Sequence, residues 1–196
     1  MVESPNTGPR RARARPRAKR AAQRVRLEVV ECDGDWSSLP PLAPILERLA
    51  EVASAHLPAD RLSGGVAALA LSSDARVRTL NRRWRGRDEP TNVLSFPTAP
   101  LPSRAAQGLP FLGDIVIAAE TLLREAAEAH IEPMHHFQHL VVHGLLHLLG
   151  YDHRSEREAA EMEGLEVRIL GALGIANPYA ETDSPPTTAT PLLRVS

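Results

Sequence analysis

The stretch that decides the fold of this 196-residue chain is His143-Gly144-Leu145-Leu146-His147-Leu148-Leu149-Gly150-Tyr151-Asp152-His153. His143 and His147 stand four residues apart, so they share one face of a helix. Gly150 tolerates positive φ and is a good helix terminator, which lets the chain turn back toward that face. His153 can then meet the other two histidines. The stretch therefore predicts a helix, a tight turn and three converging imidazoles.

Three histidines at this spacing predict a metal site with one open position. Two imidazoles four residues apart on a helix can bind one ion. Three protein nitrogens leave the fourth position for water, as in catalytic sites, whereas structural sites are closed by four protein ligands. A bound metal lowers the pKa of such a water to about 7. A surface or hydrogen-bonded core role suits a lone histidine better than three with this spacing.

The same spacing is the ligand skeleton of the metzincin proteases. Those enzymes need a glutamate directly after the first histidine as general base, and this chain has Gly144 there. A metallopeptidase is therefore a disfavoured alternative.

The other five histidines are expected to lie outside the ligand set. His139 is four residues before His143, but a helix rises about 6 Å every four residues, so three successive turns cannot easily converge on one ion. His139 could instead orient a ligand. His135 and His136 are interpreted as polar residues near a helix start. His56 and His130 fall near helix ends, where a cationic histidine suits the dipole.

Outward from the histidines, the apolar pattern alternates between strand and helix periods. Ser155 and Glu158 fit a capping box for the last helix. The predicted fold class is α+β (mixed α/β), a small mostly mixed sheet of about four strands packed with about five helices, one of them a zincin-like metal helix. The predicted strands are 25–29, 66–71, 92–96 and 114–118; the predicted helices are 40–57, 73–84, 119–130, 133–149 and 155–173; 97–113 is a predicted loop.

Length and composition predict one domain between two loose ends. Residues 1–22 are rich in Arg, Ala and Pro and are expected to form a disordered basic arm. Residues 23–180 are expected to form a single metallo-hydrolase domain, and 181–196 a disordered tail. The single cysteine, Cys32, excludes an internal disulfide and a cysteine-built zinc site, and fits a reducing cytoplasm. No apolar run approaches the roughly 18 residues that span a bilayer.

Three blocks of this sequence resemble the YbeY family of bacterial endoribonucleases, also called rRNA maturation factors. They are the stretch from His143 to His153, Leu112-Gly113-Asp114-Ile115-Val116-Ile117, and Leu80-Asn81-Arg82-Arg83-Trp84-Arg85-Gly86-Arg87-Asp88-Glu89-Pro90-Thr91-Asn92-Val93-Leu94-Ser95-Phe96-Pro97. The blocks follow the family's order, and the resemblance as a whole extends over most of residues 25–175. Trp84 stands where the family has tyrosine, and it should keep an aromatic anchor there.

The resemblance implies one Zn(2+) per chain, held by His143, His147 and His153. It implies a single-strand-specific endoribonuclease that acts in the cytoplasm in rRNA processing, including maturation of the small-subunit rRNA 3′ end, and in ribosome quality control. The implied partner is the rRNA of the small ribosomal subunit, with ribosomal proteins and ribosome-assembly GTPases as further candidates. Neither a membrane nor DNA is expected. The alternative is a ribosome-assembly factor that binds immature rRNA and whose metal is mainly structural.

Arginines at the end of the 73–84 helix suit phosphate oxygens and a developing anion, although each could belong to a solvated basic face. The resemblance singles out Arg85 as the catalytic one. Asp152 is a candidate general base by proximity, or it only orients His153.

Polar residues also interrupt the apolar strands on either side of the loop. Asn92, Ser95 and Asp114 either make buried hydrogen bonds that fix the fold or surround the metal ligands as a second layer.

The charge pattern predicts a role for the basic arm. The net charge is −1, but nine of the 23 basic groups and one of the 24 acids fall in residues 1–26, leaving the rest at −9. An arm that binds RNA phosphates releases counterions, so deleting residues 1–22 should weaken RNA binding and flatten its salt dependence while saturated cleavage stays the same. An identical salt slope would contradict this. A start codon assigned too early, or a transit-type segment, are the alternatives.

Overall fold

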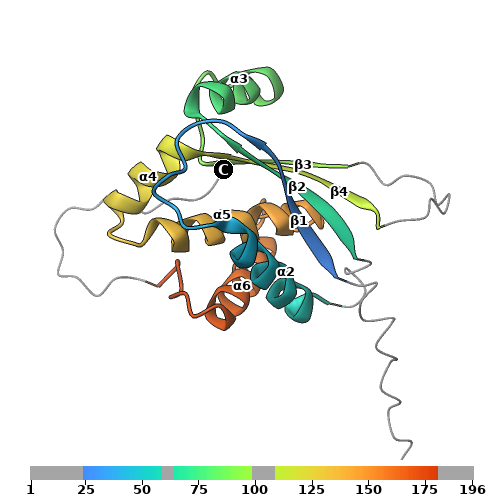
Figure 1. Cartoon of the computed structure of the whole chain (residues 1–196). Helices are drawn as coiled ribbons and strands as arrows, with labels where there is room; N and C mark the ends of the chain where they lie inside the picture. The colour runs from blue at the N-terminus through green and yellow to red at the C-terminus, as the bar shows by residue number, and fades with distance from the viewer. Residues whose placement is uncertain (1–23, 59–63, 99–108, 181–196) are drawn as a thin grey trace, which may run out of the picture.

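The computed structural model describes residues 24–58, 64–98 and 109–180. The predicted arm at 1–22 and tail at 181–196 lie outside the described residues. The described chain forms one four-stranded sheet and five helices; strands and helices alternate in its first half, and its last three elements are helices (Figure 1). The predicted α+β class, with its small mixed sheet and surrounding helices, is confirmed. Within the described ranges, no helix is long and apolar enough to cross a membrane.

The sheet has the order β1-β2-β4-β3. Strands β1, β2 and β4 run parallel, whereas β3 pairs antiparallel with β4 at one edge. A parallel pair needs a long connection, and a helix supplies it between β1 and β2. The strands are β1 (Val25–Cys32), β2 (Gly65–Ser72), β3 (Val93–Pro97) and β4 (Phe111–Ala118).

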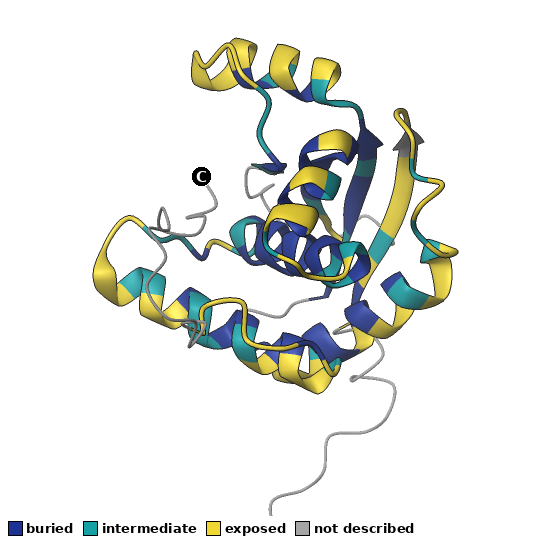
Figure 2. Ribbon diagram, turned by 90° about the vertical axis from the view of Figure 1, so that its left-hand side faces the viewer, coloured by how far each residue is buried: buried dark blue, intermediate teal, exposed yellow. Residues whose placement is uncertain are grey.

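The helices cover the two faces of the sheet unequally. Helices α2, α5 and α6 gather on one face, while α3 stands alone on the other (Figure 1). Most of α5 is buried at the centre of the molecule, and α3 is mostly exposed (Figure 2). The helices are α2 (Leu42–His56), α3 (Asp74–Arg85), α4 (Ala119–Glu128), α5 (Pro133–Leu148) and α6 (Glu156–Ala172).

The main core forms around α5 because that helix is apolar on nearly every side. Phe137, Leu140, Leu145 and Leu146 have no exposed surface. Each such side chain stabilises the fold by about 1.5–3 kcal/mol relative to an exposed position. A helix that is hydrophobic all round belongs inside a protein, and this one brings its histidines into the interior with it.

The end of α5 and the start of α6 follow the signals that the sequence predicted. Gly150 has a φ of 85°, so it ends α5 as expected. The Ser155–Glu158 capping box at the start of α6 is confirmed, with both reciprocal hydrogen bonds present. The turn that carries His153 therefore lies between two local signals, the glycine that ends α5 and the capping box that starts α6.

The predicted loop over 97–113 is wrong at its two ends, and residues 99–108 lie outside the described residues. Pro97 still pairs with Gly113, and β4 begins at Phe111 rather than at Asp114. The backbone pairing on both sides of β4 outweighs the poor strand propensity of Gly113, whose φ is 141°. The helix expected over 119–130 ends earlier, at Glu128.

Gly144 lies where α5 touches the sheet. A Cβ at this position would come within 2.8 Å of Ile115 Cγ2 and 3.1 Å of Ser95 Oγ. Position 144 therefore faces β3 and β4, and any side chain there would press against Ile115 and Ser95. The chain has no carboxylate at the position where the zincin pattern places its general base.

Gly144→Ala should lower the free energy of unfolding by about 1–3 kcal/mol, because a methyl group would be forced into a filled space. Gly164→Ala in α6 is the matched control: its Cβ would meet only Arg168 Nη1 at 3.5 Å. That change should stabilise by about 0.5–1 kcal/mol through helix propensity. Urea unfolding in the presence of a chelator measures both. A Gly144→Ala protein as stable as the unmodified chain would contradict the close packing.

Candidate metal centre

Three histidines meet at the C-terminal end of α5. His143 and His147 come from successive turns of the helix, and His153 comes from the turn that follows Gly150. One side-chain nitrogen from each lies within 4.8 Å of the others. Within the described ranges, these three form the one group of histidine, cysteine and acidic side chains gathered closely enough to hold a metal ion.

Hydrogen bonds fix which nitrogen of each helical histidine faces the centre. His143 Nδ1–H donates to Glu166 Oε1 at 2.8 Å, and His147 Nδ1–H donates to the Tyr151 carbonyl oxygen at 3.0 Å. The proton of each neutral ring is thus on Nδ1, and the lone pair is on Nε2. The two Nε2 atoms face each other at 3.0 Å.

This arrangement fits a cation. Two nitrogen lone pairs at 3.0 Å repel each other unless a proton or a metal ion lies between them. His153 Nε2 is buried and has no hydrogen-bond partner. Buried polar atoms in native proteins nearly always have a partner. The three nitrogens could therefore hold one metal ion together, and imidazole is a donor that zinc binds.

Electrostatics keep His147 in the form that binds metal. Burial, together with the neighbouring rings of His143 and His153, lowers the pKa of His147 to about 4. The ring is therefore neutral at pH 7. A metal-binding histidine must be neutral, so His147 needs no deprotonation to accept an ion at that pH.

Glu166 of α6 is the buried carboxylate that orients this cluster. One oxygen accepts from His143; the other accepts from His139 Nε2–H at 3.2 Å and from the Tyr179 hydroxyl. Burial alone would raise the pKa of Glu166, but the hydrogen bonds from His139 and His143 and the charge of those rings lower it to about 2. The carboxylate is therefore ionised and increases the basicity of His143.

The expectation that His139 lies outside the ligand set agrees with its position. Its Nε2 is directed to Glu166 and lies 3.4 Å from the Tyr179 hydroxyl. His136 is buried and donates to Glu125 of α4 at 2.8 Å. Neither belongs to the converging group.

A hollow of about 460 Å³ opens beside the histidines. Arg85, the last residue of α3, lines it together with His147 and His153. Partial burial and the nearby Arg87 lower the pKa of Arg85, which stays protonated at neutral pH. The hollow is lined by Arg85, Ser95, Pro97, His147, Gly150, Tyr151, Asp152, His153 and Arg154.

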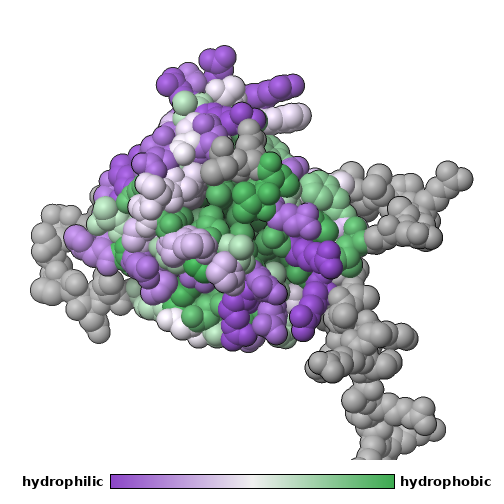
Figure 3. Space-filling view, in the orientation of Figure 1, coloured by the Kyte–Doolittle hydropathy of each residue, from purple (hydrophilic) through white to green (hydrophobic). Residues whose placement is uncertain are grey.

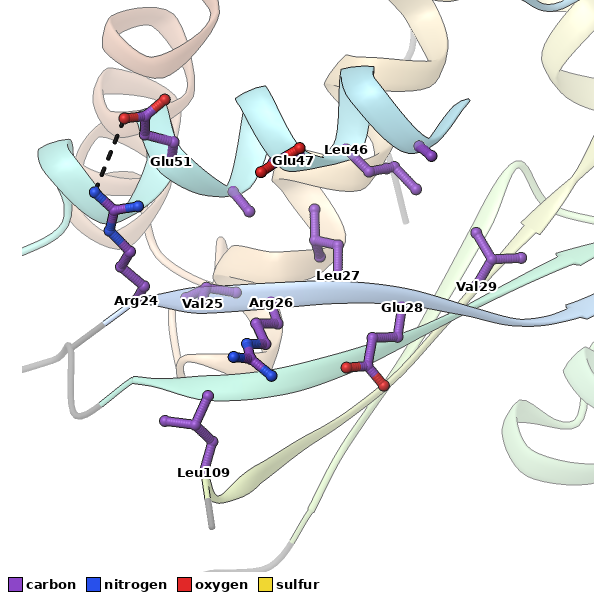
Figure 4. A pocket seen from close by; sticks show the side chains of 12 residues that line it. Arg24, Val25, Arg26, Leu27, Glu28, Val29, Leu46, Glu47, Glu51 and Leu109 are labelled. Atoms are coloured by element: carbon purple, nitrogen blue, oxygen red, sulfur yellow. Dashed lines mark ion pairs between the residues drawn. The ribbon is translucent and has the colours of Figure 1, made fainter. Parts of the chain in front are cut away.

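A larger hollow of about 820 Å³ lies between β1 and α2, away from the histidines (Figure 4). Its lining mixes apolar side chains with charged ones, among them the ion pair of Arg24 with Glu51 at 3.9 Å. No histidine or cysteine is among the described residues that line it. The hollow at the histidines is therefore the chemical site, although it is the smaller of the two.

Asp152 is held on both sides. Its Oδ1 accepts from the His153 backbone N–H at 2.9 Å, and its Oδ2 lies 2.7 Å from Arg154 Nε. The first bond fixes the backbone that carries His153, and the second brings a guanidinium to the rim of the hollow.

The family model described as "Endoribonuclease YbeY" matches residues 44–174. The chain belongs to the YbeY family.

Proteins that carry the family's name match most of this chain. The protein named Endoribonuclease YbeY of Azorhizobium caulinodans is 46% identical over 156 residues, covering 80% of this chain and 97% of that protein. The protein of the same name from Rhodospirillum rubrum is 49% identical over 171 residues, covering 82% and 84%. A solution structure from Thermotoga maritima has 23% identity, covers 80% of this chain and 99% of its own, and has a TM-score of 0.46.

The polar strand residues of this YbeY-family chain divide between the two roles considered for them. Ser95 lines the hollow. Asn92 is buried and donates to Glu125 Oε2 at 3.0 Å, which joins β3 to α4. Asp114 pairs with Phe96, and cross-strand partners share a face of the sheet. Because Phe96 packs with the cluster under α3, Asp114 lies on the face opposite the histidines.

Sequence reasoning missed Glu166, Tyr179 and Arg154. One signal for Glu166 was present in the sequence of α6. Its position falls on the apolar stripe of α6 with Met162, Leu165 and Ile169, all of which are buried. A carboxylate on a core stripe needs a buried partner, and the histidines of α5 were the available donors. Tyr179 follows a proline beyond α6, and no pattern marked it.

Metal affinity should separate ligands from supporting groups. His143→Ala, His147→Ala and His153→Ala should each lose the bound metal, and His139→Ala should retain more than His153→Ala. Glu166→Gln keeps the side-chain shape but should weaken binding by about 10- to 100-fold, because the amide cannot accept as strongly from His143. Competition with a chromophoric chelator at pH 7 measures these affinities.

Glu161→Gln, on the exposed side of the same helix, is the matched control and should bind metal normally. Circular dichroism checks that each variant folds. Full metal occupancy in His147→Ala, or a greater loss in His139→Ala than in His153→Ala, would overturn the ligand assignment.

Proposed function

We propose that this chain is a zinc-dependent endoribonuclease that cleaves unpaired RNA by phosphodiester hydrolysis. The observation that supports this most directly is that Arg85 lines the same hollow as His147 and His153. A phosphate in that hollow would lie between a guanidinium and the ligand nitrogens. The name of the family and of its curated members gives the same reaction class.

The reaction joins a water oxygen to phosphorus and breaks the bond to one ribose oxygen. One proton leaves the water, and the departing ribose oxygen gains one. A divalent cation at the three histidines, when bound, supplies Lewis-acid chemistry and lowers the pKa of a coordinated water. Zinc suits an all-imidazole donor set with an open position.

The residues of the chain orient the phosphate and offset its charge. Arg85 can contact two phosphate oxygens with its planar fork and stabilise the extra negative charge of the transition state. Arg154 adds a second guanidinium at the rim. Both oxygens of Asp152 are engaged, which supports a role in positioning His153 and Arg154 over that of general base.

In the cell, we place this activity in the cytoplasm, in the processing of ribosomal RNA, including maturation of the small-subunit rRNA 3′ end and ribosome quality control. The candidate partners are small-subunit rRNA, ribosomal proteins and ribosome-assembly GTPases. Gly144 supports RNA cleavage over peptide hydrolysis, since a glycine cannot supply the carboxylate base that the peptidase pattern requires at this position.

Arg85→Lys should cut RNA at least ten-fold more slowly at saturation, because lysine keeps the charge but loses the planar fork. A ten-fold loss corresponds to about 1.4 kcal/mol of transition-state stabilisation. The fold should survive, since Arg85 is at the exposed end of α3. Turnover of an unpaired RNA, with and without a chelator, measures the effect.

Arg82→Lys, in the last turn of the same helix, is the matched control and should turn over normally. Cleavage that disappears in Arg85→Ala while RNA binding persists would support the enzyme. Binding without metal-dependent cleavage by the unmodified protein would favour the assembly factor instead. Equal turnover in Arg85→Lys and the unmodified chain would remove Arg85 from the mechanism.

A further inference from the structure

Trp84, in the last turn of α3, presents a large aromatic ring to solvent. Its side chain is 63% exposed, the highest value among the large hydrophobic residues that the structure describes. The ring makes an edge contact with Phe96 of β3, with centroids 6.2 Å apart and planes at 64°. Phe96 thus supports the ring from the sheet without covering it.

Core packing does not explain this exposure. The small cluster under α3 is closed by Val77 and Leu94, which have almost no exposed surface. Trp84 continues the stripe of Val77 and Leu80 but extends beyond the sheet that the stripe covers. Exposing so much apolar surface costs free energy that a polar residue would avoid. A surface ring of this kind often marks a binding site.

The surroundings of the ring are strongly positive. Residues 82–88 contain Arg82, Arg83, Arg85 and Arg87 and a single acid, Asp88. Asp88 is engaged by Arg78 through two hydrogen bonds of 3.0 and 3.1 Å. The guanidinium carbon of Arg83 lies 5.4 Å from the Trp84 ring centroid. Hydrophilic side chains gather over α3 in the space-filling view (Figure 3).

Trp84 is connected to the hollow at the histidines through its neighbours in the sequence. Arg85, the following residue, lines that hollow. Phe96, which contacts the ring, packs on the α3 face of the sheet, and its two neighbours Ser95 and Pro97 line the hollow. RNA bound at Trp84 would therefore meet, in the next residue of the helix, an arginine that lines the hollow.

We propose that Trp84 is a stacking platform for an unpaired base of the RNA. It is the residue next to Arg85, which would hold a phosphate of the same strand. This inference rests on the proposed function and adds to it a subsite with a defined chemistry. Every base has a π face, so stacking tolerates any sequence. A duplex buries those faces, so the platform selects unpaired strands. Arg83 and its neighbours supply charge for the adjacent phosphates.

Fluorescence tests the platform directly because the chain has two tryptophans. Trp36 packs edge-on against Phe137 and donates to the Asp33 carbonyl oxygen, so it is part of the fold. In a Trp36→Phe background, all tryptophan emission comes from Trp84. Adding unpaired oligouridine or oligoadenosine in the presence of a chelator should quench that emission saturably, and a duplex of equal length should not.

Substitutions test the same idea in the chain with Trp36 intact. Trp84→Leu keeps apolar contact with Phe96 but removes the π face, and should weaken binding of unpaired RNA by at least five-fold. Trp84→Phe should stay within about three-fold, because a smaller ring still stacks. The affinity for duplex RNA should stay the same in both variants. Circular dichroism and urea unfolding check that both variants fold.

The outcomes separate this inference from the proposed function. RNA binding that depends on Trp84, without cleavage, would support the platform and overturn the hydrolase. Cleavage with unchanged affinity and KM in Trp84→Leu would overturn the platform and keep the hydrolase. The platform is also overturned if the unmodified chain does not bind unpaired RNA. It is overturned as well if Trp84→Phe and Trp84→Leu lose the same amount of affinity for unpaired RNA. If Trp84→Leu weakens binding to protein partners and leaves RNA binding unchanged, the platform is overturned and Trp84 belongs to a protein interface.

Discussion

The close contact between α5 and the sheet at Gly144 is the constraint on which the rest of this structure depends. Because that residue has no side chain, the helix lies directly against Ile115 and Ser95. This sets the height at which His143 and His147 stand above the sheet. It also brings their end of the helix to the β3 edge, where Arg85 arrives from the opposite face. A bulkier residue would move the ligands away from the arginine that shares their hollow.

A second constraint acts on the orientation of the ligands. Glu166 is fully buried, and its charge is acceptable there because two histidines and a tyrosine hydroxyl donate to it. One carboxylate thereby joins α6 and the segment around Tyr179 to the metal helix. The network fixes the tautomer of His143, just as the Tyr151 carbonyl fixes that of His147. The hydrophobic core around α5 sets where the histidines lie, and these hydrogen bonds set how the rings of His143 and His147 are oriented.

The two faces of the sheet divide the work of recognition and chemistry. The face covered by α2, α5 and α6 holds the histidines in a mostly apolar interior. Among the described elements, α3 is the helix on the other face, and its exposed side is rich in arginine. Its last residue, Arg85, nevertheless lines the hollow beside the histidines. A strongly charged surface and a buried cluster of imidazoles can coexist in a small domain because the sheet separates them.

The sequence by itself determined the elements, the order of the metal ligands and the helix ends, because these depend on spacing and on local backbone preference. His143, His147, Gly150 and the Ser155 capping box are signals of this kind. Only the tertiary structure decided which residues surround them, because such contacts join segments distant in the chain. Glu166 is 23 residues from His143, and Asn92 turns to Glu125 rather than to the ligands. The pairing of Gly113 in β4 and the exposure of Trp84 likewise depend on neighbours that no local pattern specifies.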